Sequence, residues 1–136
     1  MAGKIRVEVV TPKGKMLDKE VEEVIAPGGE GEFGVLVGHT PMLTFIKPGI
    51  LSYLENDNFF QIAVGTGFCE VLKDRVTVLV DEAYAVEQID PVEVANEAAL
   101  LEERLLAMDP WSSSEEYREI LNMFNLAKAK VALTSQ

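Results

Sequence analysis

Apolar and polar positions alternate along the first part of the chain with a period of two residues. Ile5, Val7 and Val9 are apolar and the residues between them are charged, which is the pattern of a half-buried strand. Turn-forming residues interrupt the apolar segments at short intervals. The segments between the turns predict strands at residues 21–26, 42–46, 50–54, 59–64, 68–72 and 75–80. Short strands at such regular spacing predict a β-sandwich, or flattened barrel, over residues 1–86.

After residue 86 the period becomes that of a helix. Asp90 followed by Pro91 is typical of a helix start, Pro110 ends this helix, and Ser113 with Glu116 offers a capping box for a second one. Apolar residues then recur at steps of three and four on one side of each helix: Val94, Ala98, Leu101, Leu105 and Met108, then Tyr117, Ile120, Phe124, Ala127 and Val131. This pattern predicts an antiparallel two-helix hairpin over residues 87–136.

The apolar sides of the two predicted helices are narrow and rich in alanine. Neither helix is expected to be stable alone, because most helical stability in proteins comes from packing against other elements. The hairpin can therefore bury its apolar sides against itself, or open and offer them to a partner.

Composition narrows the classes of protein that fit this pattern. The chain has 136 residues, 48% of them apolar, and a formal net charge of -11. A charge of this sign disfavours binding to nucleic acid and to anionic membrane surfaces. No apolar run approaches the roughly 20 residues that cross a bilayer, so no direct membrane insertion is expected. A single cysteine, Cys69, excludes an internal disulfide and indicates a reducing, cytoplasmic compartment. Its side chain is expected to be a small apolar residue of the core.

The sequence contains no motif for catalysis or for a metal site. There is one histidine, and no nucleophile elbow, His-Glu-x-x-His or Cys-x-x-Cys motif is present. The segment 29–34 matches the glycine pattern of a dinucleotide-binding loop, but no helix follows it and Pro41 comes soon after. We therefore interpret these glycines as turn residues and expect neither independent enzyme activity nor a bound metal.

Residues 27–49 carry the most specific pattern in the chain. They read Pro-Gly-Gly-Glu-Gly-Glu-Phe-Gly-Val-Leu-Val-Gly-His-Thr-Pro-Met-Leu-Thr-Phe-Ile-Lys-Pro-Gly. This segment resembles the corresponding segment of the ε subunit of bacterial F-type ATP synthases, which is called δ in mitochondria. The departure is Val37, where the family usually has proline. Residues 76–83, Val-Thr-Val-Leu-Val-Asp-Glu-Ala, also resemble the last strand of that family's β domain.

The resemblance covers the whole chain and implies a function. It implies a non-catalytic subunit of the central stalk, peripheral to the cytoplasmic side of the bacterial inner membrane. The sandwich would bind the γ subunit and rest on the c-ring. Through these two contacts the subunit would couple proton translocation through the c-ring to ATP synthesis. The hairpin would inhibit ATP hydrolysis when it extends into the α/β catalytic head. An alternative of another class is a stand-alone nucleotide-sensing β domain with a helical lid.

The resemblance also implies contact residues in the glycine-rich segment. Glu32 and His39, with Gly38 and Pro41 beside the histidine, are the residues expected to face the c-ring and γ. An ordinary loop histidine that bonds to nearby backbone is the alternative interpretation of His39.

Two further groups follow from the resemblance. Some members of the family bind ATP through Ile/Leu-Asp-x-x-Arg-Ala at the start of the first helix. Here Ile89 and Asp90 are kept, but Glu93 replaces the arginine, so no tight ATP binding is expected, and a helix cap is sufficient to explain Asp90. The resemblance implies that basic residues of the extended hairpin contact an acidic segment of the catalytic β subunit, although a solvated helix face is the ordinary alternative. The basic residues available here are Arg104, Arg118, Lys128 and Lys130.

Overall fold

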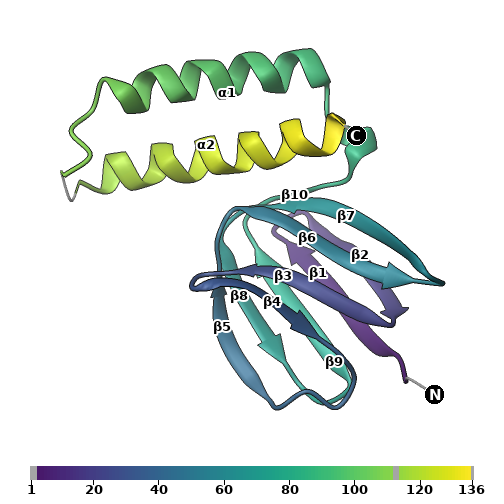
Figure 1. The fold of residues 1–136 in the computed structure, drawn as a ribbon. Helices are drawn as coiled ribbons and strands as arrows, with labels where there is room; N and C mark the ends of the chain where they lie inside the picture. The colour runs from purple at the N-terminus through teal and green to yellow at the C-terminus, as the bar shows by residue number, and fades with distance from the viewer. Residues whose placement is uncertain (1–2, 112–113, 136) are drawn as a thin grey trace.

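The computed structural model describes residues 3–111 and 114–135, and it consists of a β body and a pair of helices (Figure 1). The strands are β1 (Ile5–Thr11), β2 (Gly14–Val21), β3 (Glu23–Gly28), β4 (Gly31–Val35), β5 (Met42–Ile46), β6 (Gly49–Glu55), β7 (Asn58–Val64), β8 (Gly67–Val71), β9 (Arg75–Val80) and β10 (Ala83–Tyr84). A short 3-10 turn, η1 (Val86–Gln88), leads into α1 (Pro91–Leu106), and α2 (Glu115–Thr134) follows.

The strands form one curved sheet that folds over itself as a nearly closed sandwich. Their order is β10-β7-β6-β3-β5-β8-β9-β1-β2, and β4 pairs with β3. All neighbours are antiparallel except β1 and β9, which run parallel. The fold class predicted from the sequence, a β-sandwich followed by a two-helix hairpin, is therefore confirmed. The predicted strand list lacked β2, β4 and β10, of which β4 lies in the glycine-rich segment.

The alternation of apolar residues builds the core of the sandwich. Ile5, Val7 and Val9 of β1 are fully buried, while Arg6 between them is exposed. Cys69 of β8 belongs to the same core, as expected. Burial in this apolar surrounding raises the pKa of its thiol to about 12, so the side chain is an unreactive packing group.

The first helix has the N-cap that the sequence predicts, Asp90, whereas the N-cap of the second helix is Ser114 and not Ser113. The Asp90 carboxylate accepts hydrogen bonds from the backbone N–H of Val92, at 3.0 Å, and of Glu93, at 3.2 Å, which confirms the predicted cap. At the second helix the predicted cap, Ser113, lies outside the described residues. Ser114 is the N-cap of α2, and its hydroxyl oxygen accepts from the N–H of Tyr117.

The helix α2 lies between α1 and the sandwich (Figure 1). One side of α2 packs against α1 through the predicted stripes, where Val94 and Leu101 meet Ile120 and Ala127. A second side of α2, which the sequence pattern did not predict, packs on the sandwich. Within residues 3–111 and 114–135, no helix combines the length and the apolar character required to cross a membrane.

A charged network covers part of the outer surface of the sandwich. The Arg6 guanidinium donates two hydrogen bonds to the Asp18 carboxylate, both 2.8 Å long, and Lys15 donates a third of 3.2 Å. The hydrogen bond from Arg6, followed by that from Lys15, lowers the pKa of Asp18 to about 2.

This network predicts a specific pH dependence. A carboxyl group whose pKa is lower in the folded state stabilises the fold above its unfolded pKa, and the stabilisation disappears as pH falls through the folded pKa. Asp18→Asn is therefore expected to unfold at lower urea concentration than the natural chain at pH 7. The difference should shrink as pH falls from about 4 to about 2, because Asp18 becomes protonated. Urea titrations at several pH values test this, and a difference that stays constant with pH would contradict it.

Candidate binding surfaces

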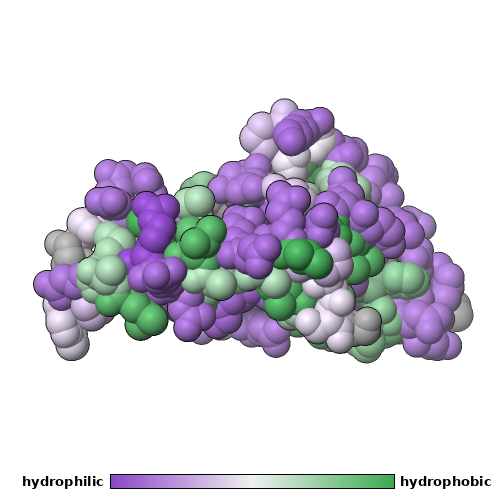
Figure 2. Space-filling view, turned by 90° about the horizontal axis from the view of Figure 1, so that it is seen from above, coloured by the Kyte–Doolittle hydropathy of each residue, from purple (hydrophilic) through white to green (hydrophobic). Residues whose placement is uncertain are grey.

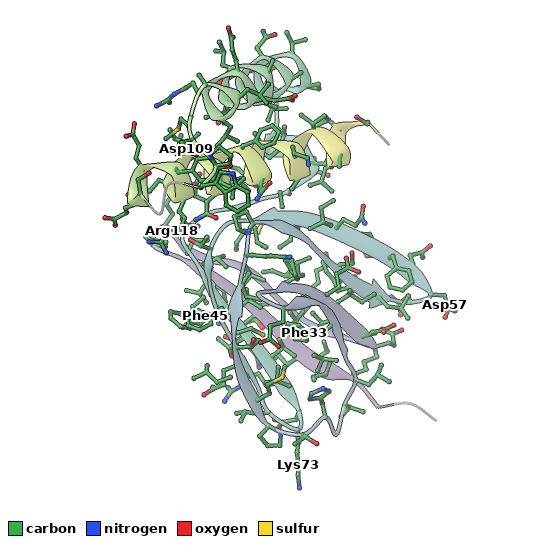
Figure 3. All side chains as sticks on the ribbon, turned by 60° about the vertical axis from the view of Figure 1, so that its left-hand side comes forward. Phe33, Phe45, Asp57, Lys73, Asp109 and Arg118 are labelled. Carbon is green, nitrogen blue, oxygen red and sulfur yellow. The ribbon has the colours of Figure 1, made fainter. Side chains whose placement is uncertain are left out.

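Four large apolar side chains project from the outer face of the sandwich, which the helices leave uncovered. They are Leu43 and Phe45 of β5, Phe68 of β8 and Leu79 of β9, and we call them the outer-face patch. Phe45 pairs with Phe68, and Phe68 with Leu79, so these three side chains form a row across adjacent strands. The rings of Phe45 and Phe68 lie 5.0 Å apart between centroids, and Phe45 points away from the body in Figure 3.

The patch is large for a surface that faces water. Leu43 is 70% exposed and Phe45 64% exposed. Contiguous exposed apolar side chains of this kind mark surfaces that bind another protein. The patch was not predicted from the sequence, although residues 42–46 read Met-Leu-Thr-Phe-Ile and are apolar at both odd and even positions. A strand that is apolar on both sides signals that both faces are covered in the working state.

Gly38, His39 and Pro41 lie in the loop between β4 and β5. The Gly38 N–H donates to the carbonyl oxygen of Lys73 at 2.7 Å, which fixes this loop beside the β8–β9 turn. Figure 3 shows Lys73 at the end of the sandwich opposite the helices. Gly38 has a φ of 86°, a conformation that favours glycine. The His39 ring nitrogen Nδ1 lies 2.7 Å from the carbonyl oxygen of Thr40, so the histidine makes a local backbone contact.

The structure does not place Glu32 in this loop. Glu32 is exposed on β4, where it pairs with Pro27, next to the turn that joins β3 and β4. Val35 is at the other end of the strand, three positions from Glu32, which corresponds to about 10 Å. Glu32 and His39 thus mark two neighbouring regions of the sandwich and not one contact point.

Ile89 and Asp90 lie at the junction of sandwich and hairpin. Ile89 is half-buried and packs against both the α2–sandwich contact and the α1–α2 contact. A cavity of about 270 Å³ opens beside them, lined by Tyr84, Gln88, Ile89, Asp90, Glu93, Val94, Glu97 and Lys130.

The charges of this junction cavity do not fit a nucleotide. Asp90, Glu93 and Glu97 contribute three carboxylates, and Lys130 is the one cation among the lining residues. Carboxylates repel the phosphates of ATP, and the Asp90 carboxylate is already occupied by the helix cap. Among the described residues, no three histidine, cysteine, aspartate or glutamate side chains are grouped so that they could hold a metal ion.

The four basic residues of the hairpin are not clustered. Arg104 lies in the last turn of α1. Arg118 lies in the first turns of α2, near the connector between the helices (Figure 3). Lys130 is twelve residues further along α2, about 18 Å away. The Lys128 ammonium lies 5.3 Å from the centre of the Phe124 ring on its own helix, whereas the Lys130 ammonium lies 3.8 Å from the centre of the Tyr84 ring on the sandwich.

The hairpin also presents apolar surface between its helices. Figure 2, viewed from above, shows apolar side chains exposed among the polar ones on this side of the molecule. A groove of about 710 Å³ runs between α1 and α2, and its apolar lining consists of four alanines together with Leu105, Leu106, Phe124 and Val131. Two charged residues, Glu102 and Lys128, also line this groove.

The sequence matches known proteins over its whole length. The family model described as the β-sandwich domain of the ATP synthase delta/epsilon chain matches residues 4–86. ATP synthase epsilon chain 2 of Syntrophotalea carbinolica is 36% identical over 136 residues, which is 100% of this chain and 97% of the relative. The epsilon chain of Geotalea daltonii is 40% identical over 132 residues, 97% of this chain and 96% of the relative. That of Thermodesulfovibrio yellowstonii is 45% identical over 105 residues, covering 77% and 75%.

Solved structures share the fold. A chain in the Euglena gracilis mitochondrial ATP synthase structure that contains OSCP, F1 and the c-ring superposes with a TM-score of 0.77 at 21% identity, covering 97% of this chain and 82% of that one. A chain of the Tetrahymena thermophila central stalk and c-ring structure gives a TM-score of 0.58 at 14% identity, covering 98% and 96%. The family model and the full-length relatives together show that this chain belongs to the ATP synthase epsilon chain family.

Proposed function

We propose that the chain works in the central stalk of a bacterial F-type ATP synthase, as a connector between the γ subunit and the c-ring. As an epsilon chain it is a subunit of the synthase and not itself catalytic. In this proposal residues 1–86 form the connecting domain and residues 87–136 the regulatory one. The complex would place the chain peripherally, on the cytoplasmic side of the inner membrane.

The outer-face patch is the surface proposed to bind γ. Its large, rigid aromatic side chains are the type that dominates binding energy in protein interfaces. Its neighbours on the same face include Glu70, which pairs with Leu43, so a polar rim borders the apolar centre. This patch is the observation that carries the proposal, since the helices leave this face open to a partner.

The loop of Gly38, His39 and Pro41 is proposed to face the c-ring. It lies at the end of the sandwich away from the helices, and its backbone is held by the contact with Lys73. Glu32 contributes from the neighbouring strand and not from the same point. A single exposed ion pair contributes at most about 1 kcal/mol, so this contact would position the sandwich while the patch supplies affinity.

The hairpin is proposed to regulate ATP hydrolysis by moving between the compact form described here and an extended form that reaches the α/β catalytic head. Two packings of one element that differ by a few kcal/mol make such a switch. The exposed groove between α1 and α2 supports this proposal, because it offers apolar surface that a partner could cover. The cations available to contact an acidic segment of the catalytic β subunit are Arg104, Arg118, Lys128 and Lys130.

The charge of the junction cavity argues against the nucleotide-sensor alternative and gives a prediction. Mg-ATP is expected to bind the isolated chain weakly, with a Kd above about 1 mM, because three carboxylates line the cavity. Glu93→Arg should tighten binding several-fold, since it replaces one of these anions with a cation. Isothermal titration calorimetry measures both. Micromolar binding to the natural chain would contradict this assignment and favour the sensor.

The proposed function is tested by adding the full chain to a complex of the catalytic head and γ that lacks it. We expect the chain to elute with the complex in size-exclusion chromatography and to lower its rate of ATP hydrolysis. Retention without inhibition would support the connector and exclude the regulatory role. A chain that elutes alone would overturn the proposal.

A further inference from the structure

The hairpin is attached to the sandwich through a small apolar surface. Its buried members are Ala63 of β7 and Leu126, Ala129 and Leu133 of α2, with Ile50, Tyr84 and Ile89 partly buried around them. Two of the four buried side chains are alanines, which contribute little apolar area. The attachment therefore depends on contacts beyond this surface.

Lys130 supplies such a contact. It lies on α2 beside Ala129, and its ammonium reaches the face of the Tyr84 ring at 3.8 Å from the ring centre. Tyr84 belongs to β10 and pairs with Ala63, so the ring borders the apolar surface under α2. An ammonium this close to an aromatic face is attracted by the ring, and more strongly where water is excluded, as at this half-buried lysine.

The surroundings of Lys130 join three elements at one point. The Tyr84 hydroxyl donates a hydrogen bond to Glu82, which fixes the ring on the sandwich side. Glu93 and Glu97 of α1, together with its cap Asp90, line the same cavity as the ammonium. The cation of α2 thus meets a ring of the sandwich and faces carboxylates of α1.

Lys128 provides an internal comparison. It precedes Lys130 by two residues, and residues at this spacing lie on different sides of a helix. Its ammonium lies over Phe124 of the same helix, and the side chain is exposed along the groove between α1 and α2. It makes no aromatic contact with the described part of the sandwich.

We infer that Lys130 is a latch that holds the hairpin on the sandwich through Tyr84. When the latch opens, α2 leaves the Ala63 surface and the ammonium becomes free for an acidic partner. In the compact form the Lys130 ammonium is therefore held at the Tyr84 ring. In the extended form the same ammonium would be accessible to an acidic partner. The role of the latch in regulation rests on the proposed function, whereas the latch itself is a property of the isolated chain.

The latch is tested by measuring how often α2 leaves the sandwich. Ala63→Cys places a thiol on the surface that α2 covers, and its rate of reaction with Ellman's reagent reports the open fraction. Adding Lys130→Met, which keeps the aliphatic stem, is expected to raise this rate about tenfold. The matched control Lys128→Met should leave it within about twofold. The buried Cys69 gives the background rate, measured in the chain without the introduced cysteine.

A second variant separates the latch from a general loss of charge. Tyr84→Leu keeps an apolar side chain but removes the ring, and it should raise the rate as Lys130→Met does. The two changes together should raise it no further, because they remove one interaction. Equal rates for the two lysine variants, no effect of Lys130→Met, or fully additive effects would each overturn the latch. Should Ala63→Cys disturb packing, as judged by circular dichroism, the same rates are read at Ala129→Cys.

This assay uses the chain alone, so its outcome is independent of binding to γ. A failed latch with intact γ binding would leave the connector proposal standing. A confirmed latch in a chain that does not bind γ would reject the connector proposal. The conclusion that Lys130 holds the hairpin on the sandwich would then still stand.

Discussion

Replacing Phe45 and Phe68 together by alanine is expected to weaken binding of the chain to γ about 100-fold, equivalent to about 2.7 kcal/mol. Both rings are exposed and touch each other in the centre of the outer-face patch. Aromatic side chains at the centre of an interface lose most when truncated, because they bury large areas and exclude water from their neighbours. Isothermal titration calorimetry of the variant against γ measures the change.

The control for this experiment is another exposed phenylalanine. Phe59 of β7 is 56% exposed, close to the 64% of Phe45, but it lies outside the patch. Phe59→Ala is expected to leave the affinity for γ within about twofold, as for a residue outside an interface. Exposed side chains contribute little to folding, so all the variants should unfold near the same urea concentration as the natural chain. Equal losses of affinity for the two phenylalanine sites would show that the patch is not the γ surface.

Gly67→Ala is expected to destabilise the sandwich by about 3 kcal/mol or more, because it forces apart two paired strands. A Cβ atom at Gly67 would lie 1.8 Å from the carbonyl oxygen of Leu79 and 2.8 Å from the Cα atom of Val80. Both are backbone atoms of β9, which pairs with β8 at this position and cannot move aside without breaking the pairing. Urea unfolding followed by circular dichroism measures the loss.

Gly29→Ala is the matched control for this change. A Cβ atom at Gly29 would meet the Phe45 side chain at 3.5 Å, which is ordinary van der Waals contact, and the residue does not have a positive φ. The free energy of unfolding should therefore change by less than about 0.5 kcal/mol. A loss of less than 1 kcal/mol for Gly67→Ala would mean that the β8–β9 register is wrong.

Local periodicity was sufficient to predict most of the fold. The alternation of Ile5, Val7 and Val9 predicted the inward face of β1, and Asp90 predicted the start of α1, because both depend on neighbouring residues only. The strand β4 was missed because its glycines give no alternation. Its existence depends on pairing with β3, which no local pattern reveals.

The candidate surfaces were less predictable, because they depend on residues far apart in the chain. The apolar pattern at residues 42–46 predicts a strand, but only the sheet order shows that Phe45 meets Phe68 on a face that the helices leave uncovered. Charge alone puts Lys128 and Lys130 in one group. Their different surroundings follow from the helix geometry and from the position of Tyr84 across the junction.

We propose that γ covers the outer-face patch of the sandwich. Hydroxyl-radical footprinting of the full chain, with and without γ, is the sharpest test, since oxidation reports the exposure of individual side chains. We expect γ to protect Leu43, Phe45 and Phe68 and to leave Phe59 as reactive as in the free chain. Protection of Phe59 with unchanged oxidation of Phe45 and Phe68 would contradict it.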